Sequence, residues 1–144
     1  MMKIWPLILL FISISTHADS NFGMWGTTCD GDGFSININN KPNYLVVNDN
    51  QIVIKVHAKE IDSNKISLYY DSVADLGRGG MNFGWKNVSR IKPVAELSII
   101  KKSGELRWKG FYDNKKSKYF WITEPDFVQS YSEGGVIKLH KCGI

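Results

Sequence analysis

The chain has 144 residues, of which 18 are lysine or arginine and 14 are aspartate or glutamate, and its formal net charge at neutral pH is +4. This length accommodates one globular domain with a single hydrophobic core. The basic residues are spread over the predicted turns and strands, and the sequence contains no nucleic-acid-binding motif. We therefore interpret the positive charge as a solvated surface and expect no nucleic-acid partner.

The N-terminal segment has the pattern of a cleavable signal peptide. Lys3 precedes an apolar run over residues 4–12, and small residues follow at Thr16 and Ala18. The run is too short to span a bilayer core of about 30 Å, and small residues are what signal peptidase needs at its cleavage site. The sequence therefore predicts a signal peptide over residues 1–18. The mature chain, residues 19–144, is expected to be one periplasmic or secreted domain without a stable membrane anchor.

Cys29 and Cys142 lie near the two ends of the predicted mature chain, and the sequence has no other cysteine. In an oxidising compartment such a pair normally forms a disulfide bond, which here would tie the first strand to the last. Neither cysteine belongs to a Cys-x-x-Cys pair, so the sequence indicates neither a redox centre nor a zinc site.

From Phe34 onward, short segments alternate apolar and polar residues, which is the period of half-buried β-strands. Turn residues such as asparagine, glycine and aspartate separate the segments. The predicted strands cover residues 23–29, 34–38, 44–47, 52–58, 66–70, 95–99, 105–112, 119–123 and 136–142. Residues 73–76 and 126–130 could each hold one turn of helix, but no segment has the pattern of an ordinary amphipathic helix. About eight strands in this order favour an all-β fold, an antiparallel meander that forms a closed or nearly closed barrel.

The stretch from Leu76 to Trp85 interrupts this rhythm with four glycines. Glycine lets the backbone adopt positive φ, and the arginine, methionine and aromatic residues of this stretch are types enriched at binding surfaces. We predict that the stretch is a loop that binds a partner through Arg78, Met81, Asn82, Phe83 and Trp85. The alternative is that the glycines form a wide turn and the aromatic rings fold back into the core. The glycine spacing matches neither a nucleotide-binding loop nor a dinucleotide fingerprint.

Gly23-Met24-Trp25 opens the mature chain ahead of the strands and resembles the Gly-x-Trp signature of lipocalin-like barrels. That resemblance implies a tryptophan that closes one end of the barrel and a cup for a small apolar ligand, although the later Thr-Asp-Tyr motif is absent. The export signal, small size, terminal cysteines and all-β pattern are also similar to small periplasmic barrels that inhibit lysozymes. Their Ser-Gly-x-x-Tyr loop is not found here. Such inhibitors complement a basic enzyme, whereas this chain is itself basic, so charge would oppose that encounter.

Candidate catalytic residues are few. His57 and His140 are expected on the outer faces of strands, without a carboxylate or cysteine at a recognisable spacing. Residues 30–33, Asp-Gly-Asp-Gly, begin like a calcium loop but lack its later ligands, so a turn is predicted. Glycoside hydrolysis needs two carboxylates at a defined distance from each other. The candidates lie in predicted loops, and the sequence does not give the distances between them: Asp71, Asp75, Glu124 and Asp126. We therefore predict no catalytic residue, no metal site and no cofactor.

These observations favour a non-enzymatic exported binding protein with a protein partner, acting as an inhibitor of, or protection against, a hydrolase or toxin in the envelope. Such a protein is expected to have a filled barrel and a solvent-facing cluster of Arg78, Phe83 and Trp85. A lipocalin-like carrier of a small apolar ligand would instead need a hollow, apolar interior. An unrecognised hydrolase, the third alternative, would need a cleft with converging titratable groups.

Overall fold

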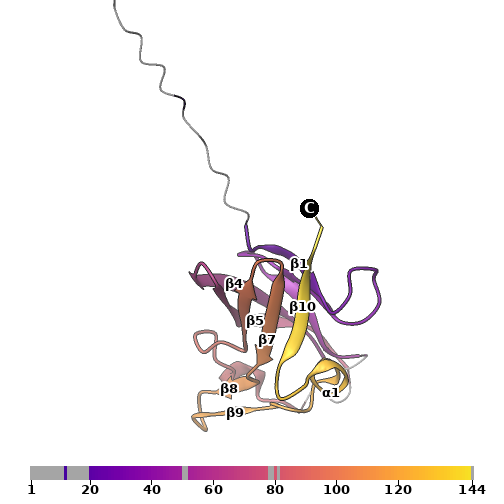
Figure 1. Cartoon of the computed structure of the whole chain (residues 1–144). Coiled ribbons are helices and arrows are strands. Elements are labelled where there is room, and N and C mark those ends of the chain that lie inside the picture. The colour runs from indigo at the N-terminus through magenta and orange to yellow at the C-terminus, as the bar shows by residue number, and fades with distance from the viewer. Residues whose placement is uncertain (1–11, 13–19, 50–51, 78–79, 81, 144) are drawn as a thin grey trace, which may run out of the picture.

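The computed structural model describes residues 12, 20–49, 52–77, 80 and 82–143. They form an all-β fold whose main sheet has eight antiparallel strands and is nearly closed into a barrel, as the alternating pattern predicts (Figure 1). Among these residues, no helix combines the length and the apolar character that crossing a membrane would require.

Most of the barrel is a meander, because most strands that follow one another in the sequence lie next to one another in the sheet. Its strands are β1 (Gly23–Gly26), β2 (Ser35–Ile38), β3 (Asn43–Asn48), β4 (Ile52–Asp62), β5 (Lys65–Leu76), β6 (Ala95–Ile100), β7 (Ser103–Trp108) and β10 (Ile137–Cys142). Their order across the sheet is β2-β1-β10-β7-β6-β5-β4-β3. Pairing of β1 with β10 places Met24 opposite Cys142 and so joins the start of the domain to its end.

Two connections carry the remaining elements. A short 3-10 helix, η1 (Trp85–Asn87), lies between β5 and β6. Between β7 and β10 the chain forms a separate two-stranded sheet from β8 (Phe111–Asp113) and β9 (Lys118–Phe120), followed by the helix α1 (Asp126–Tyr131). The one-turn helix predicted near residues 126–130 is therefore confirmed. The one predicted at residues 73–76 is wrong, because Val73 pairs with Ile54 and the segment continues β5.

The seam of the barrel lies between β2 and β3, the two edge strands of the main sheet. They are consecutive and close together, but no β-ladder joins them in the described chain. The ring of Phe127 in α1 stacks on Phe34, with the centroids 4.6 Å apart, and the Asp126 carboxylate accepts a hydrogen bond of 2.9 Å from the Asp49 amide. The helix therefore closes the seam where strand pairing does not.

Side chains fill the barrel interior. Trp25, Ile54 and Leu97 are fully buried, and the indole N–H of Trp25 donates to the Asn21 carbonyl at 2.9 Å. Gly104 lies against them: a Cβ at this position would come within 2.8 Å of Leu97 Cδ1 and 3.0 Å of Trp25 Cζ3. A glycine inside a strand often marks such a close approach, and here it makes room for the indole ring.

The hairpin near the C-terminus differs from the prediction. A continuous strand over residues 105–112 was expected, but β7 ends at Trp108 and the chain turns at Gly110, whose φ is +97°. A Cβ at Gly110 would also lie only 2.4 Å from the carbonyl oxygen of Phe120. The alternation of apolar and polar residues continues across this turn, so periodicity alone does not reveal that β8 leaves the barrel.

The predicted disulfide bond is confirmed. Cys29 and Cys142 are bridged across 113 residues of sequence, with their Cα atoms 5.4 Å apart. The bond fixes the loop that follows β1 to the last residue of β10, and its presence fits an oxidising compartment.

Candidate functional site

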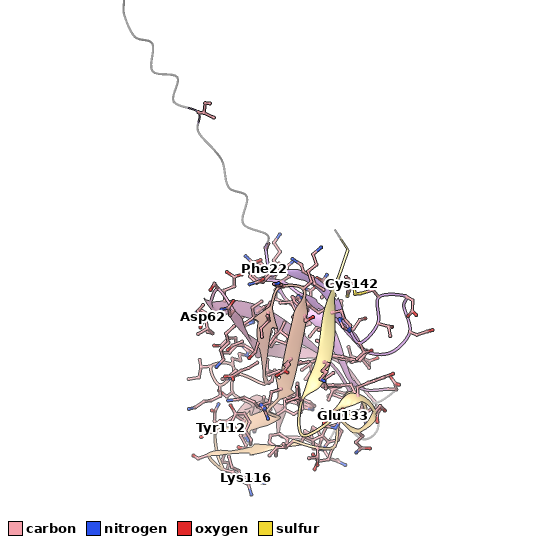
Figure 2. The ribbon with its side chains drawn as sticks, in the orientation of Figure 1. Phe22, Asp62, Tyr112, Lys116, Glu133 and Cys142 are labelled. Atoms are coloured by element: carbon pink, nitrogen blue, oxygen red, sulfur yellow. A yellow bond between two sulfur atoms is a disulfide. The ribbon has the colours of Figure 1, made fainter. Side chains whose placement is uncertain are left out.

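The predicted binding loop lies at one end of the barrel, beside the β8–β9 hairpin. Figure 1 places β8 and β9 below the barrel strands. In Figure 2, Tyr112 and Lys116 mark this end, whereas Phe22 and Cys142 lie at the opposite one. We call the described residues 82–92 and 111–120 together the loop–hairpin end.

Backbone hydrogen bonds join the loop to the hairpin. The Ser89 amide donates to the Tyr112 carbonyl and the Asn114 amide donates to the Asn87 carbonyl, each at 2.8 Å. Val88 forms an isolated antiparallel bridge with Asp113. Segments that are distant in the sequence therefore form one continuous surface.

Trp85 anchors the loop to the aromatic core. Its indole N–H donates to the Gly80 carbonyl at 2.7 Å. Its ring centroid lies 5.2 Å from that of the buried Phe111 and 5.9 Å from that of Tyr70. The half-buried Trp85 side chain thus supports the loop rather than extending freely from it.

Phe83 is half-buried and forms one wall of an open pocket. Its ring meets Phe120 and Trp121 edge to face, with centroids 5.8 and 5.1 Å apart. The pocket beside it has a volume of about 280 Å³ and is lined by Asn82, Phe83, Gly84, Asp113, Lys116, Lys118 and Phe120. Ring surface therefore lies next to polar and charged groups in a single recess.

The predicted site residues have different positions. Asn82 is exposed and lines this pocket with Phe83, whereas Trp85 packs against the aromatic core. Arg78 and Met81 lie outside the described residues. Sequence reasoning did not include the hairpin residues that complete the recess, because nothing in the sequence near residues 111–120 shows that they face the loop.

Basic residues gather at the loop–hairpin end. Residues 82–92 and 111–120 contain six basic residues and one acidic residue, a net charge of +5, whereas the other residues of 19–144 contain eleven basic and thirteen acidic residues, a net charge of −2. This concentration differs from the expectation that the basic residues are spread over the turns and strands. Six exposed cationic side chains lie on the loop–hairpin end: Lys86, Arg90, Lys92, Lys115, Lys116 and Lys118.

Asp113 is the one acidic residue in the two segments of this end. Its carboxylate accepts hydrogen bonds from the backbone amides of Lys115 and Lys116, at 2.8 and 3.1 Å, and so stabilises the hairpin turn. The ion pairs found among the described residues lie elsewhere and join His57 to Asp71, Lys65 to Glu96 and Lys109 to Glu96. Within the described chain, the six cations are therefore not neutralised by ion pairs.

The hairpin is fixed on its outer side by two tyrosines. The Tyr119 hydroxyl donates to the Pro93 carbonyl at 3.0 Å, and the Lys92 ammonium lies 5.5 Å from the centre of the Tyr112 ring. Burial raises the pKa of Tyr119, and the nearby Glu96 carboxylate raises it further. Tyr119 therefore stays a hydrogen-bond donor at neutral pH and holds the hairpin against the loop.

Two further groups of titratable residues were candidates in the sequence, the histidines and the turn at residues 30–33. His57 Nδ1 lies 3.8 Å from Asp71 Oδ1 on the outer face of β4 and β5, a pairing across strands that sequence spacing did not indicate, and His140 is exposed. The Asp30 carboxylate accepts from the Asp32 amide at 3.0 Å, as expected for a turn rather than a calcium loop. In the part of the chain that the structure describes, no three His, Cys, Asp or Glu residues are placed to hold a metal ion.

The loop–hairpin end is suited to recognition. The Asn82 amide can donate and accept hydrogen bonds, the lysine ammonium groups attract anions, and the phenylalanine edges offer apolar contact. The function has to be inferred from this chemistry, because comparison of the chain with protein-family models, curated proteins and solved structures found no match.

Proposed function

We propose that this protein is an exported, non-enzymatic binding protein that inhibits, or protects against, a hydrolase or toxin acting in the cell envelope. The loop–hairpin end contacts the partner. Asn82 and Phe83 make the direct contacts within the described loop, and Arg78 and Met81, which the sequence predicts to bind as well, lie outside the described residues. Trp85 acts as a positioning residue, since it packs on Phe111 and hydrogen-bonds to Gly80.

The observation that carries this proposal is the position of Phe83. A phenylalanine side chain is ordinarily buried in the core. Here the ring is half-buried, held at three sides by Trp85, Phe120 and Trp121, and it still lines an open pocket. A ring fixed in this way loses little conformational entropy when a partner covers it, which favours an interface hot spot.

The interior of the barrel supports this proposal over a ligand carrier. Trp25 and Leu97 pack closely on Gly104, since a Cβ there would lie 2.8 Å from Leu97 Cδ1 and 3.0 Å from Trp25 Cζ3. A carrier instead needs a concave apolar site of several hundred cubic ångströms. Export is inferred from the signal-peptide pattern, and the Cys29–Cys142 bond is consistent with it.

Replacing Phe83 with alanine tests the proposal. Because the ring is only half-buried, the substitution should lower the free energy of unfolding by about 1–2 kcal/mol, less than the 3–5 kcal/mol typical of a buried phenylalanine. Binding of a partner captured from envelope extracts or secretions should weaken by about 2 kcal/mol or more, the size associated with hot spots. Urea unfolding and titration calorimetry on the same samples give the two quantities.

Ile100→Ala is the matched control, since Ile100 is an apolar side chain that is 78% exposed and lies beyond the loop–hairpin end. It should change neither quantity by more than about 0.5 kcal/mol. If folded Phe83→Ala protein binds the captured partner as tightly as the unmodified protein does, the loop is not the binding surface.

A further inference from the structure

The charge of the loop–hairpin end indicates the chemistry of its partner. Six exposed cations lie on the loop–hairpin end, and two of them, Lys116 and Lys118, line the Phe83 pocket. Asp113, the single acid of this end, also lines the pocket, and its carboxylate accepts hydrogen bonds from two backbone amides. Gathering like charges on one surface costs folding free energy through their mutual repulsion. A partner that carries the opposite charge removes this repulsion and gains attraction at long range.

The apolar groups of this end are arranged to receive a side chain. Phe83 and Phe120 meet at an interplanar angle of 89° in a recess whose lining includes the charged residues Lys116, Lys118 and Asp113. Membrane-binding surfaces insert protruding apolar side chains, and single-stranded nucleic acid stacks on open aromatic faces. The recess here is lined by phenylalanine rings and lysines. It instead fits one apolar side chain that has carboxylates around it.

We propose that the loop–hairpin end recognises an acidic face of a protein, in which aspartate or glutamate carboxylates surround an apolar side chain. That side chain enters the pocket lined by Phe83 and Phe120, and the carboxylates pair with Lys116, Lys118 and the other cations of this end. Ile91, which is 83% exposed between Arg90 and Lys92, adds apolar contact beside the charged groups. The inference rests on the proposed function and specifies the partner's chemistry.

The test uses a defined probe and the mature protein labelled with ¹⁵N. The probe is a short peptide in which one tryptophan is flanked on both sides by glutamates, and its neutral counterpart carries glutamine instead. Titration of the acidic peptide should shift the amide resonances of residues 82–86 and 113–118. The affinity should fall about tenfold between ionic strengths of about 0.01 M and 0.15 M, because salt screens exposed charges.

Two charge-reversal variants locate the interaction. Lys116→Glu/Lys118→Glu should weaken binding of the acidic peptide about tenfold or more. Lys101→Glu/Lys102→Glu makes the same change in net charge at a different exposed turn, between β6 and β7, and should leave the affinity within about twofold. Thermal unfolding of both variants confirms that they remain folded.

The inference would be overturned if the acidic peptide shifted no amide resonances, if the neutral peptide bound equally well, or if both charge-reversal variants weakened binding of the acidic peptide equally. Preferential binding of phosphatidylglycerol vesicles or of a single-stranded oligonucleotide over the acidic peptide would also overturn it. Equal binding of the neutral peptide at residues 82–86 would remove the electrostatic inference while leaving the loop as a binding surface. The proposed function is tested separately by Phe83→Ala, so the two failures are distinguishable.

Discussion

Replacing Cys29 and Cys142 together with serine is expected to lower the free energy of unfolding by about 2–5 kcal/mol. The bond spans 113 residues, and the chain-entropy model assigns about 4.7 kcal/mol to a loop of about 100 residues. The bond also holds the loop after β1 against the end of β10, so its loss frees both segments in the native state. Urea unfolding of the double variant measures the effect.

Reduction of the unmodified protein provides the control. The reduced protein and Cys29→Ser/Cys142→Ser should unfold at similar urea concentrations, because both lack the same cross-link. If the double variant is as stable as the oxidised protein, the bond does not constrain the barrel and its role is not structural.

Trp25→Ala is expected to lower the free energy of unfolding by about 3–5 kcal/mol, the usual range for removal of a buried tryptophan from a packed core. The indole is fully buried, touches Gly104 and bonds to the Asn21 carbonyl, so the substitution leaves a cavity and an unpaired acceptor. Ile100→Ala, on the exposed side of β6, should cost no more than about 0.5 kcal/mol.

Chemical unfolding of the two variants in parallel measures this difference. A cost below about 1 kcal/mol for Trp25→Ala would indicate that the interior is loosely filled around the indole. The carrier function would then regain support, since space beside Trp25 could hold a small apolar ligand.

The barrel could be predicted from the sequence because its strands follow a strict period of two. Ile52, Ile54, Val56 and Ala58 are all buried in β4, as their alternation with polar residues predicts. The disulfide bond was predictable for a different reason, since two cysteines leave a single intramolecular pairing.

The candidate site was less predictable because it depends on contacts between distant segments. The half-buried state of Phe83 depends on Phe120 and Trp121, which the turn at Gly110 places beside the loop. The same turn places Lys116 and Lys118 in one pocket with Asn82 and Phe83, although the sequence separates them. A period of two gives the face of each strand but not the place where β8 leaves the barrel, so neither the pocket nor its charge follows from the pattern.

Hydrogen exchange of the protein with and without its captured partner tests the central claim most directly. Amides that a partner covers, or whose opening it suppresses, exchange more slowly in the complex. We expect slower exchange in residues 82–92 and 111–120, and little change in the turns at residues 62–64 and 101–102. Protection confined to those turns or to the seam between β2 and β3, with unchanged exchange at the loop–hairpin end, would contradict the account.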